Sequence, residues 1–168
     1  EGEYDAELVG VNEQLGVAVL RPADGLAPMS VATFSEASPR LKSEVAVAGY
    51  SFEGVLGSPT VTYGTLADLR GLQGEEELTR LALAPLPGDA GGPVFDAGGS
   101  VVGMLLPAPT GTGRQLPPDV SFAASGDVIR AILSDEGIAT VGSRPIGSIA
   151  PEDLTTLAGE VTVLVSCW

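Results

Sequence analysis

Residues 86 to 103 decide the fold, and they read Leu86-Pro-Gly-Asp-Ala-Gly-Gly-Pro-Val-Phe-Asp-Ala-Gly-Gly-Ser-Val-Val-Gly103. The stretch opens with a turn rich in glycine, whose backbone adopts conformations that other residues avoid. A short apolar strand follows, then Asp96-Ala-Gly-Gly99, which is typical of a tight hairpin, and then a second apolar strand. The pattern predicts a sharp loop that leads into an antiparallel β-hairpin.

The rest of the chain has the same rhythm. Its 23 glycines and 13 prolines separate short valine-rich runs, which is typical of an antiparallel all-β domain rather than of βαβ units. Proline-, serine- and glycine-rich segments at residues 26–42 and 108–119 are expected to be surface loops. We expect strands at residues 4–11, 16–21, 44–50, 60–66, 78–83, 92–95, 101–106 and 120–124.

One segment after the last of these strands has helical rather than strand spacing. Val128, Ile129, Ile132 and Leu133 form the stripe of an amphipathic helix over residues 127–133. Ser125 stands where an N-cap residue belongs. The sequence therefore predicts one helix that directly follows the last of these strands in the chain.

The C-terminal 25 residues contain two further signals. Pro151, followed by two acidic residues, predicts a short helical turn that Gly159 ends. Val161, Val163 and Val165 then alternate with other residues, so we expect a terminal strand. Because such a strand needs a sheet to join, we expect it to dock on the hairpin of residues 4–21 with its valines inward.

Charge and composition exclude several classes of function. The net charge is −14 and the isoelectric point is near 4.1, so the phosphate backbone of a nucleic acid would be repelled. No apolar run approaches the roughly 20 residues that a membrane-spanning helix needs. The chain contains no histidine, which excludes a Ser-His-Asp site, a histidine-containing zinc site and a haem histidine ligand within it. We expect no cofactor and no metal.

The single cysteine, Cys167, allows no internal disulfide. It is either a spare thiol or the partner of a cysteine in a segment upstream of Glu1. The chain starts without a methionine, so we expect a processed or truncated product.

Gly88-Asp-Ala-Gly-Gly-Pro93 resembles the nucleophile loop of the trypsin-like serine proteases, whose pattern is Gly-Asp-Ser-Gly-Gly-Pro. Ala90 stands where that family has its nucleophilic serine. The resemblance implies that the N–H groups of Gly88 and Ala90 form the oxyanion hole. It also implies that Asp89, Gly91, Gly92 and Pro93 are structural parts of the loop, with Asp89 held by local polar groups or a buried amine.

The flanking sequence resembles the bacterial Deg-type branch of this family. The resemblance implies an all-β, trypsin-like double barrel that divides into three parts: residues 1–43 as a remnant of the first barrel and a linker, 44–137 as a complete second barrel plus helix, and 138–168 as a tail. The segment Val120-Ser-Phe-Ala-Ala-Ser125 resembles the strand before the helix in that branch. Ser121, Phe122 and Ala123 would then be the edge that pairs with a peptide.

All three catalytic groups of the family are missing from this chain, and the resemblance places the strand of the catalytic His before Tyr4. Gly16 stands where the family has its catalytic Asp, Ala90 replaces the nucleophile, and no histidine exists to act as the base. Two explanations remain open. The chain is either a naturally degenerate homologue, or Ala90 was introduced and either Gly16 is not the matching position or the carboxylate was relocated to a residue such as Asp24 or Asp5.

These observations predict a catalytically inactive serine protease homologue that binds a peptide or protein, or serves as a scaffold. The alternatives are a truncated, Ser-to-Ala-substituted fragment of an active trypsin-like endopeptidase, and a domain that only packs against other modules. Relatives of the Deg type imply a periplasmic or secreted location.

Overall fold

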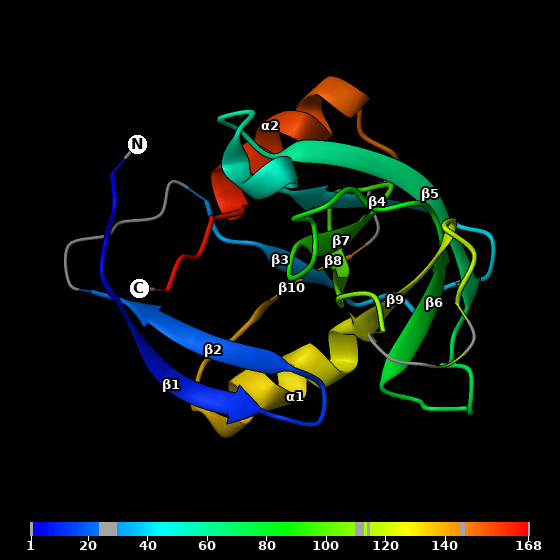
Figure 1. Cartoon of the computed structure of the whole chain (residues 1–168), viewed down its shortest axis with the longest axis horizontal. Coiled ribbons are helices and arrows are strands. Elements are labelled where there is room, and N and C mark those ends of the chain that lie inside the picture. The colour runs from blue at the N-terminus through cyan, green and yellow to red at the C-terminus, as the bar shows by residue number, and fades with distance from the viewer. Residues whose placement is uncertain (1, 24–29, 110–112, 114, 145–146, 168) are drawn as a thin grey trace.

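The computed structural model describes residues 2–23, 30–109, 113, 115–144 and 147–167. Within this part of the chain every expected strand from residue 4 to residue 124 is present, both expected helical segments are present, and two short strands are added (Figure 1). The elements are β1 (Ala6–Asn12), β2 (Val17–Pro22), β3 (Thr33–Ser35), β4 (Glu44–Gly49), the 3-10 turn η1 (Ser51–Gly54), β5 (Thr60–Asp68), β6 (Leu78–Ala82), β7 (Pro93–Asp96), β8 (Val101–Leu105), β9 (Val120–Ser125), α1 (Gly126–Asp135), β10 (Val141–Ser143) and α2 (Pro151–Val161).

Six strands form a closed antiparallel barrel, in the order β8-β7-β4-β5-β6-β9. The barrel closes because β9 pairs with β6, where Leu78 lies opposite Ala124, and also with β8, where Leu105 lies opposite Ala123. The expected second barrel is thus confirmed. Closure leaves none of these six strands as a long unpaired edge.

Strand β4 lies at the centre of the packing because both of its faces are buried. Val45 and Val47 point into the barrel, where they pack with residues such as Leu81 and Leu105. Ala46 and Ala48 alternate with these valines and face the outer core instead. The strand therefore reads as a continuous apolar run and joins the two cores.

Two short strands extend the sheet beyond the barrel at β8. Phe34 of β3 pairs in parallel with Val101 of β8, and β10 pairs in parallel with β3. Residues 26–42 were expected to be loop throughout, so β3 corrects that expectation within residues 30–42. The buried side chain of Phe34 explains the difference, since it anchors the segment in the outer core.

The hairpin of β1 and β2 is a separate two-stranded sheet. Val17 and Val19 are buried, whereas Leu8 and Val11 are exposed. Figure 1 shows the hairpin beside α1. An added Cβ at Gly10 would overlap the side chain of Glu136, which follows α1, so the hairpin and the end of that helix are in close contact.

Helix α1 agrees with the sequence prediction. Ser125 caps it, since its Oγ accepts a hydrogen bond of 3.4 Å from the backbone N of Val128. The helix packs beside β8 and β9.

The C-terminal segment differs from its prediction. Helix α2 continues through Gly159 to Val161, and no strand follows within residues 162–167. Leu154 and Ala158, four residues apart, are buried on the outer face of the barrel. Val163 and Val165 are 70% and 57% exposed, so the expected terminal strand, docked on the first hairpin with its valines inward, is wrong.

The physical reason is that this segment buries more apolar side chains as a helix than it would as a strand. One face of the helix carries Leu154, Leu157, Ala158 and Val161. This face packs against the outer core, which contains Phe34 of β3 and the barrel residues Ala46, Ala48 and Phe95. Within the described residues, neither helix is long and apolar enough to cross a membrane.

Candidate functional site

The glycine-rich loop of residues 86–92 lies between β6 and β7 and packs directly on backbone. A Cβ at Gly88 would lie 2.8 Å from the carbonyl oxygen of Tyr50, and a Cβ at Gly92 would overlap the carbonyl oxygen of Ala48. Gly88 also has a φ of +95°, a left-handed conformation that favours glycine. These two glycines allow the loop to lie against the end of β4 and the start of η1.

Asp89 holds this loop from within. Its side chain is 1% exposed. One carboxylate oxygen accepts a hydrogen bond of 2.6 Å from the hydroxyl of Ser51, and the other accepts one of 2.8 Å from the backbone N of Leu86. The hydroxyl of Ser51 also bonds to that of Thr60. Asp89 therefore has local polar partners and a structural role.

Backbone hydrogen bonds fix both sides of the loop. The N–H of Phe52 donates to the carbonyl of Pro87 over 2.6 Å, and the N–H of Gly91 donates to the carbonyl of Leu105 over 2.8 Å. Within the described residues, the N–H groups of Gly88 and Ala90 donate to no backbone carbonyl. Both residues are exposed. These two amides are thus the donors that the loop can offer to an oxygen atom of a ligand.

Residue 90, which the resemblance matches to the nucleophile, carries only a methyl group. Ala90 supplies no hydroxyl, and Gly16, which was matched to the catalytic Asp, supplies no carboxylate. Gly16 lies exposed in the turn between β1 and β2 with a φ of +67°, so the turn itself favours glycine there. Asp5 is exposed, and its backbone carbonyl accepts a hydrogen bond from Ala23. Asp24 lies outside the described residues.

The expected peptide-binding edge is already occupied. Ser121, Phe122 and Ala123 pair with β6 on one side. On the other side the N–H of Leu106 donates to the carbonyl of Phe122 over 2.9 Å, and Ala123 lies opposite Leu105. Barrel closure uses both sides of β9 at Phe122 and Ala123, so the three residues together are not a free edge and the expectation is corrected.

An apolar surface beside the loop was missed by sequence reasoning. Phe52, Val55 and Leu56 are 46%, 82% and 54% exposed, and Leu86 on the loop is 38% exposed. We call these four residues the apolar shelf. Phe52 has a φ of 56°, which is unusual for a bulky residue and fixes the sharp course of η1. That course depends on the tertiary bond to Pro87, which no local pattern reveals.

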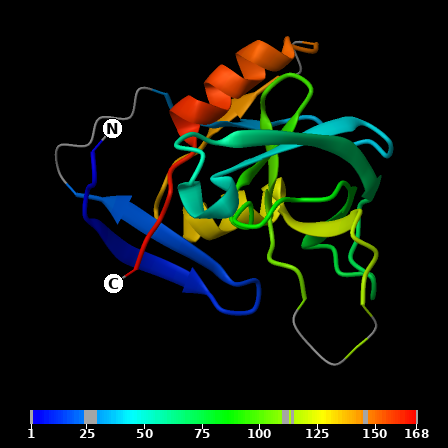
Figure 2. The same cartoon turned by 45° about the horizontal axis from the view of Figure 1, so that its top comes forward.

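The C-terminal tail passes along the same region. The hydroxyl of Tyr50 donates to the carbonyl of Thr162 at 3.5 Å, and the side chain of Leu164 lies 3.0 Å from where a Cβ of Gly54 would be. Figure 2 shows residues 162–167 running from α2 past η1 toward the β1–β2 hairpin. Cys167 near the end is exposed. In the part of the chain that the structure describes, acidic and cysteine side chains form no group that could hold a metal ion.

Comparison with known proteins identifies what this arrangement resembles. The family model described as the trypsin-like peptidase domain matches residues 1–104, which include the barrel strands up to β8 and the glycine-rich loop. Among solved structures, the chain is similar to Rv3671c from M. tuberculosis H37Rv, in a structure described as the Ser343Ala mutant, inactive form. The TM-score is 0.60 at 23% identity, over 86% of this chain and 68% of that one, which shows a shared fold.

A curated relative is also similar in sequence. The uncharacterized protein y4bJ of Sinorhizobium fredii is 31% identical over 170 residues, which covers 96% of this chain. The chain spans 26% of the length of that relative.

Proposed function

We propose, from the premise that this chain belongs to the trypsin-like peptidase domain family, that it is a catalytically inactive member which binds a peptide or protein segment at the loop of residues 86–92. The observation that carries the proposal is Ala90. Ala90 is exposed on a loop that the hydrogen bonds of the buried Asp89 hold in place, and its side chain has no hydroxyl. The loop architecture is kept while the reactive group is absent.

Binding rests on two features of the described site. The N–H groups of Gly88 and Ala90 are donors for a carbonyl or carboxylate oxygen of the ligand. The apolar shelf lies next to them, because Phe52 is bonded directly to Pro87 of the loop. A ligand with an apolar side chain next to a backbone carbonyl fits both features. The net charge of −14 favours neutral or basic segments over acidic ones.

Inactivity follows from the chemistry that this chain lacks. A serine protease needs a nucleophile and an adjacent base, and with no histidine and with Ala90 at the loop apex this chain supplies neither. A bound peptide would therefore be held without acyl transfer. We further propose that the parent protein acts in the periplasm or after secretion, where Cys167 could pair with a cysteine of another segment.

Binding of labelled apolar peptides, measured by fluorescence anisotropy, tests the proposal. The variant Leu56→Ala removes an exposed side chain of the shelf, and Leu72→Ala is the matched control because Leu72 is a similarly exposed leucine in the β5–β6 connection. We expect Leu56→Ala to weaken binding several-fold and Leu72→Ala to leave it unchanged. Equal effects of the two variants, or no binding at all, would contradict the shelf as a binding surface.

A further inference from the structure

A cavity of about 580 Å³ opens at the far end of the barrel from the glycine-rich loop. The loop adjoins the end of β4 at Gly49 and the start of β7 at Pro93. The cavity adjoins the opposite ends of the same strands, at Glu44 and Asp96. The two places are thus separated by the length of the strands, and the cavity is not part of the site described above.

The inner wall of the cavity is the apolar core of the barrel. Val45, Leu66, Leu81 and Val94 line it and belong to the core that fills the barrel. Its volume lies within the range of roughly 300–1,000 Å³ that is typical of small-molecule sites. A ligand that enters would place an aliphatic group against this wall.

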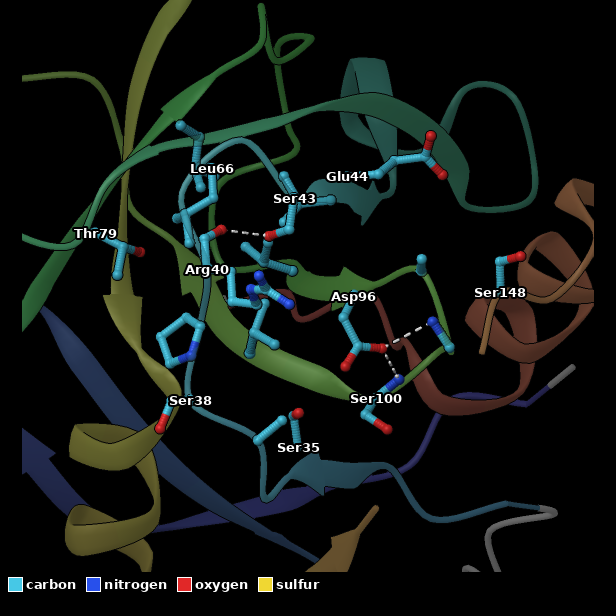
Figure 3. Close-up of a pocket in the computed structure, with 18 of the residues that line it drawn as sticks. Ser35, Ser38, Arg40, Ser43, Glu44, Leu66, Thr79, Asp96, Ser100 and Ser148 are labelled. Atoms are coloured by element: carbon cyan, nitrogen blue, oxygen red, sulfur yellow. Dashed lines mark hydrogen bonds between the residues drawn. The ribbon is translucent and has the colours of Figure 1, made fainter. Parts of the chain in front are cut away.

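The mouth of the cavity carries one positive group, Arg40, and two acids, Asp96 and Glu44, of which Asp96 faces Arg40. Figure 3 shows the Arg40 side chain reaching toward Asp96 across the cavity. Arg40 forms no salt bridge within the described residues, so the two charges do not touch. The Arg40 backbone is fixed, because its carbonyl accepts a hydrogen bond of 2.7 Å from the hydroxyl of Ser43. The opposite charges of Arg40 and Asp96 therefore lie on the two sides of the cavity mouth without contact.

Among the residues that the structure describes, no hydrogen bond is donated to Oδ2 of Asp96. Its Oδ1 accepts hydrogen bonds of 3.0 Å from the N–H of Gly98 and 2.9 Å from that of Ser100. These bonds orient the carboxylate, and Figure 3 shows its other oxygen on the cavity side. The second acid at the mouth, Glu44, points away from Arg40 in the same view.

We propose that this cavity binds a small aliphatic zwitterion of the α-amino acid type. The carboxylate of the ligand would pair with the Arg40 guanidinium, which forms two parallel hydrogen bonds to such a group. The ammonium of the ligand would pair with Oδ2 of Asp96, and its aliphatic side chain would lie against Val45, Leu66 and Leu81. A free amino acid and a short aliphatic peptide share this chemistry.

Titration of the isotopically labelled protein, followed by its amide NMR signals, tests the proposal. L-leucine, the dipeptide Leu-Leu, leucinamide and N-acetyl-leucine are the four probes. We expect leucine or Leu-Leu to shift the signals of the cavity residues Thr79 and Leu81, and the stronger of the two identifies the source. Leucinamide lacks the carboxylate and N-acetyl-leucine lacks the ammonium, so each is expected to bind about tenfold more weakly or worse.

Matched variants separate this site from a nonspecific effect. Arg40→Gln and Asp96→Asn are each expected to weaken leucine binding about tenfold, and the side-chain amide that Asp96→Asn introduces retains an oxygen for the N–H groups of Gly98 and Ser100. Arg21→Gln, an exposed arginine on β2, is the control and should change nothing. Leu56→Ala on the apolar shelf should also leave leucine binding intact, which keeps this test independent of the proposed function.

Three results would each overturn the proposal. The first is the absence of shifts at Thr79 and Leu81 with both leucine and Leu-Leu. The second is equal binding of leucine, leucinamide and N-acetyl-leucine. The third is leucine affinity that Arg40→Gln leaves unchanged.

Discussion

The buried carboxylate of Asp89 accepts a hydrogen bond of 2.6 Å from the hydroxyl of Ser51, which is itself fully buried. This bond links the glycine-rich loop to the start of η1, two segments that lie 38 residues apart in the chain. The contact fixes Asp89 and hence the positions of the N–H groups of its two neighbours, Gly88 and Ala90. The loop is thus held in place by buried polar contacts, and Ala90 next to Asp89 carries no reactive group.

Replacing Asp89 tests how much the loop depends on this bond. Asp89→Ala leaves the Ser51 hydroxyl and the Leu86 N–H without their acceptor, and an unsatisfied buried group costs about 1–3 kcal/mol. We expect the free energy of unfolding, measured by urea denaturation, to fall by about 2 kcal/mol or more. Asp119→Ala, at an exposed position, should change it by less than about 0.5 kcal/mol. A loss no larger than that of the control would show that the bond contributes little.

Gly159 offers a stabilising substitution. It lies inside α2 without a positive φ, and nothing is within 4 Å of the place where a Cβ would be. Gly159→Ala should raise the free energy of unfolding by roughly 0.5–1 kcal/mol, because glycine in a helix interior is unfavourable. Thermal denaturation measures the change. A decrease would mean that the helix ends before Gly159, as the sequence alone suggested.

Leu154 anchors α2 on the barrel, whereas Leu164 in the tail is 52% exposed. Leu154→Ala should lower the free energy of unfolding by about 2–5 kcal/mol through lost burial and the cavity that remains. Leu164→Ala should cost less than about 0.5 kcal/mol in the same denaturation experiment. Similar losses in both variants would instead support a docked tail.

We expect the stability of the fold to depend on alkaline pH through the ionisation of Tyr63. Partial burial raises the pKa of Tyr63 above its ordinary value of 10.0, and the nearby charges of Glu44 and Glu152 raise it further. Because the raised pKa belongs to the folded state, the stability contributed by Tyr63 is present below pH 10 and is lost as the pH rises through the folded pKa.

The tyrosinate absorbance, taken as the difference between the wild type and Tyr63→Phe, measures this pKa. Glu44→Gln should lower the pKa of Tyr63, since it removes one of the two charges. Glu7→Gln on β1 should leave it unchanged. A pKa of Tyr63 that does not respond to Glu44→Gln would contradict the contribution of Glu44 and leave burial and Glu152 as the causes.

The barrel was predictable because its strands carry local signals. Glycine, proline and the Asp96–Gly99 hairpin mark the ends of short valine-rich runs, and the closing of six such strands follows from the family pattern. The glycine-rich turn before β7 was predictable for the same reason, whereas the buried contacts of Asp89 with Ser51 and Leu86 are visible only in the structure.

The predictions that were wrong concern segments whose structure depends on contacts between residues far apart in the sequence. Val161, Val163 and Val165 alternate like a strand, yet the apolar outer face of β4 and β7 selects a helix up to Val161. Ser121–Ala123 read as an edge because the sequence does not show which strands lie on either side of β9. The cavity behind Arg40 is formed by segments near residues 35–43, 94–100 and 147–148, which no local pattern brings together.

The measurement that tests the central claim most directly is the activity of the Ala90→Ser variant. The purified variant is incubated with a fluorophosphonate probe and, separately, with a fluorogenic peptide, and the unsubstituted chain serves as the control. A serine without an adjacent base is a poor nucleophile at neutral pH, so we expect no labelling and no hydrolysis above the control. Labelling of the new serine, or peptide hydrolysis that depends on it, would contradict the account and favour a fragment of an active endopeptidase.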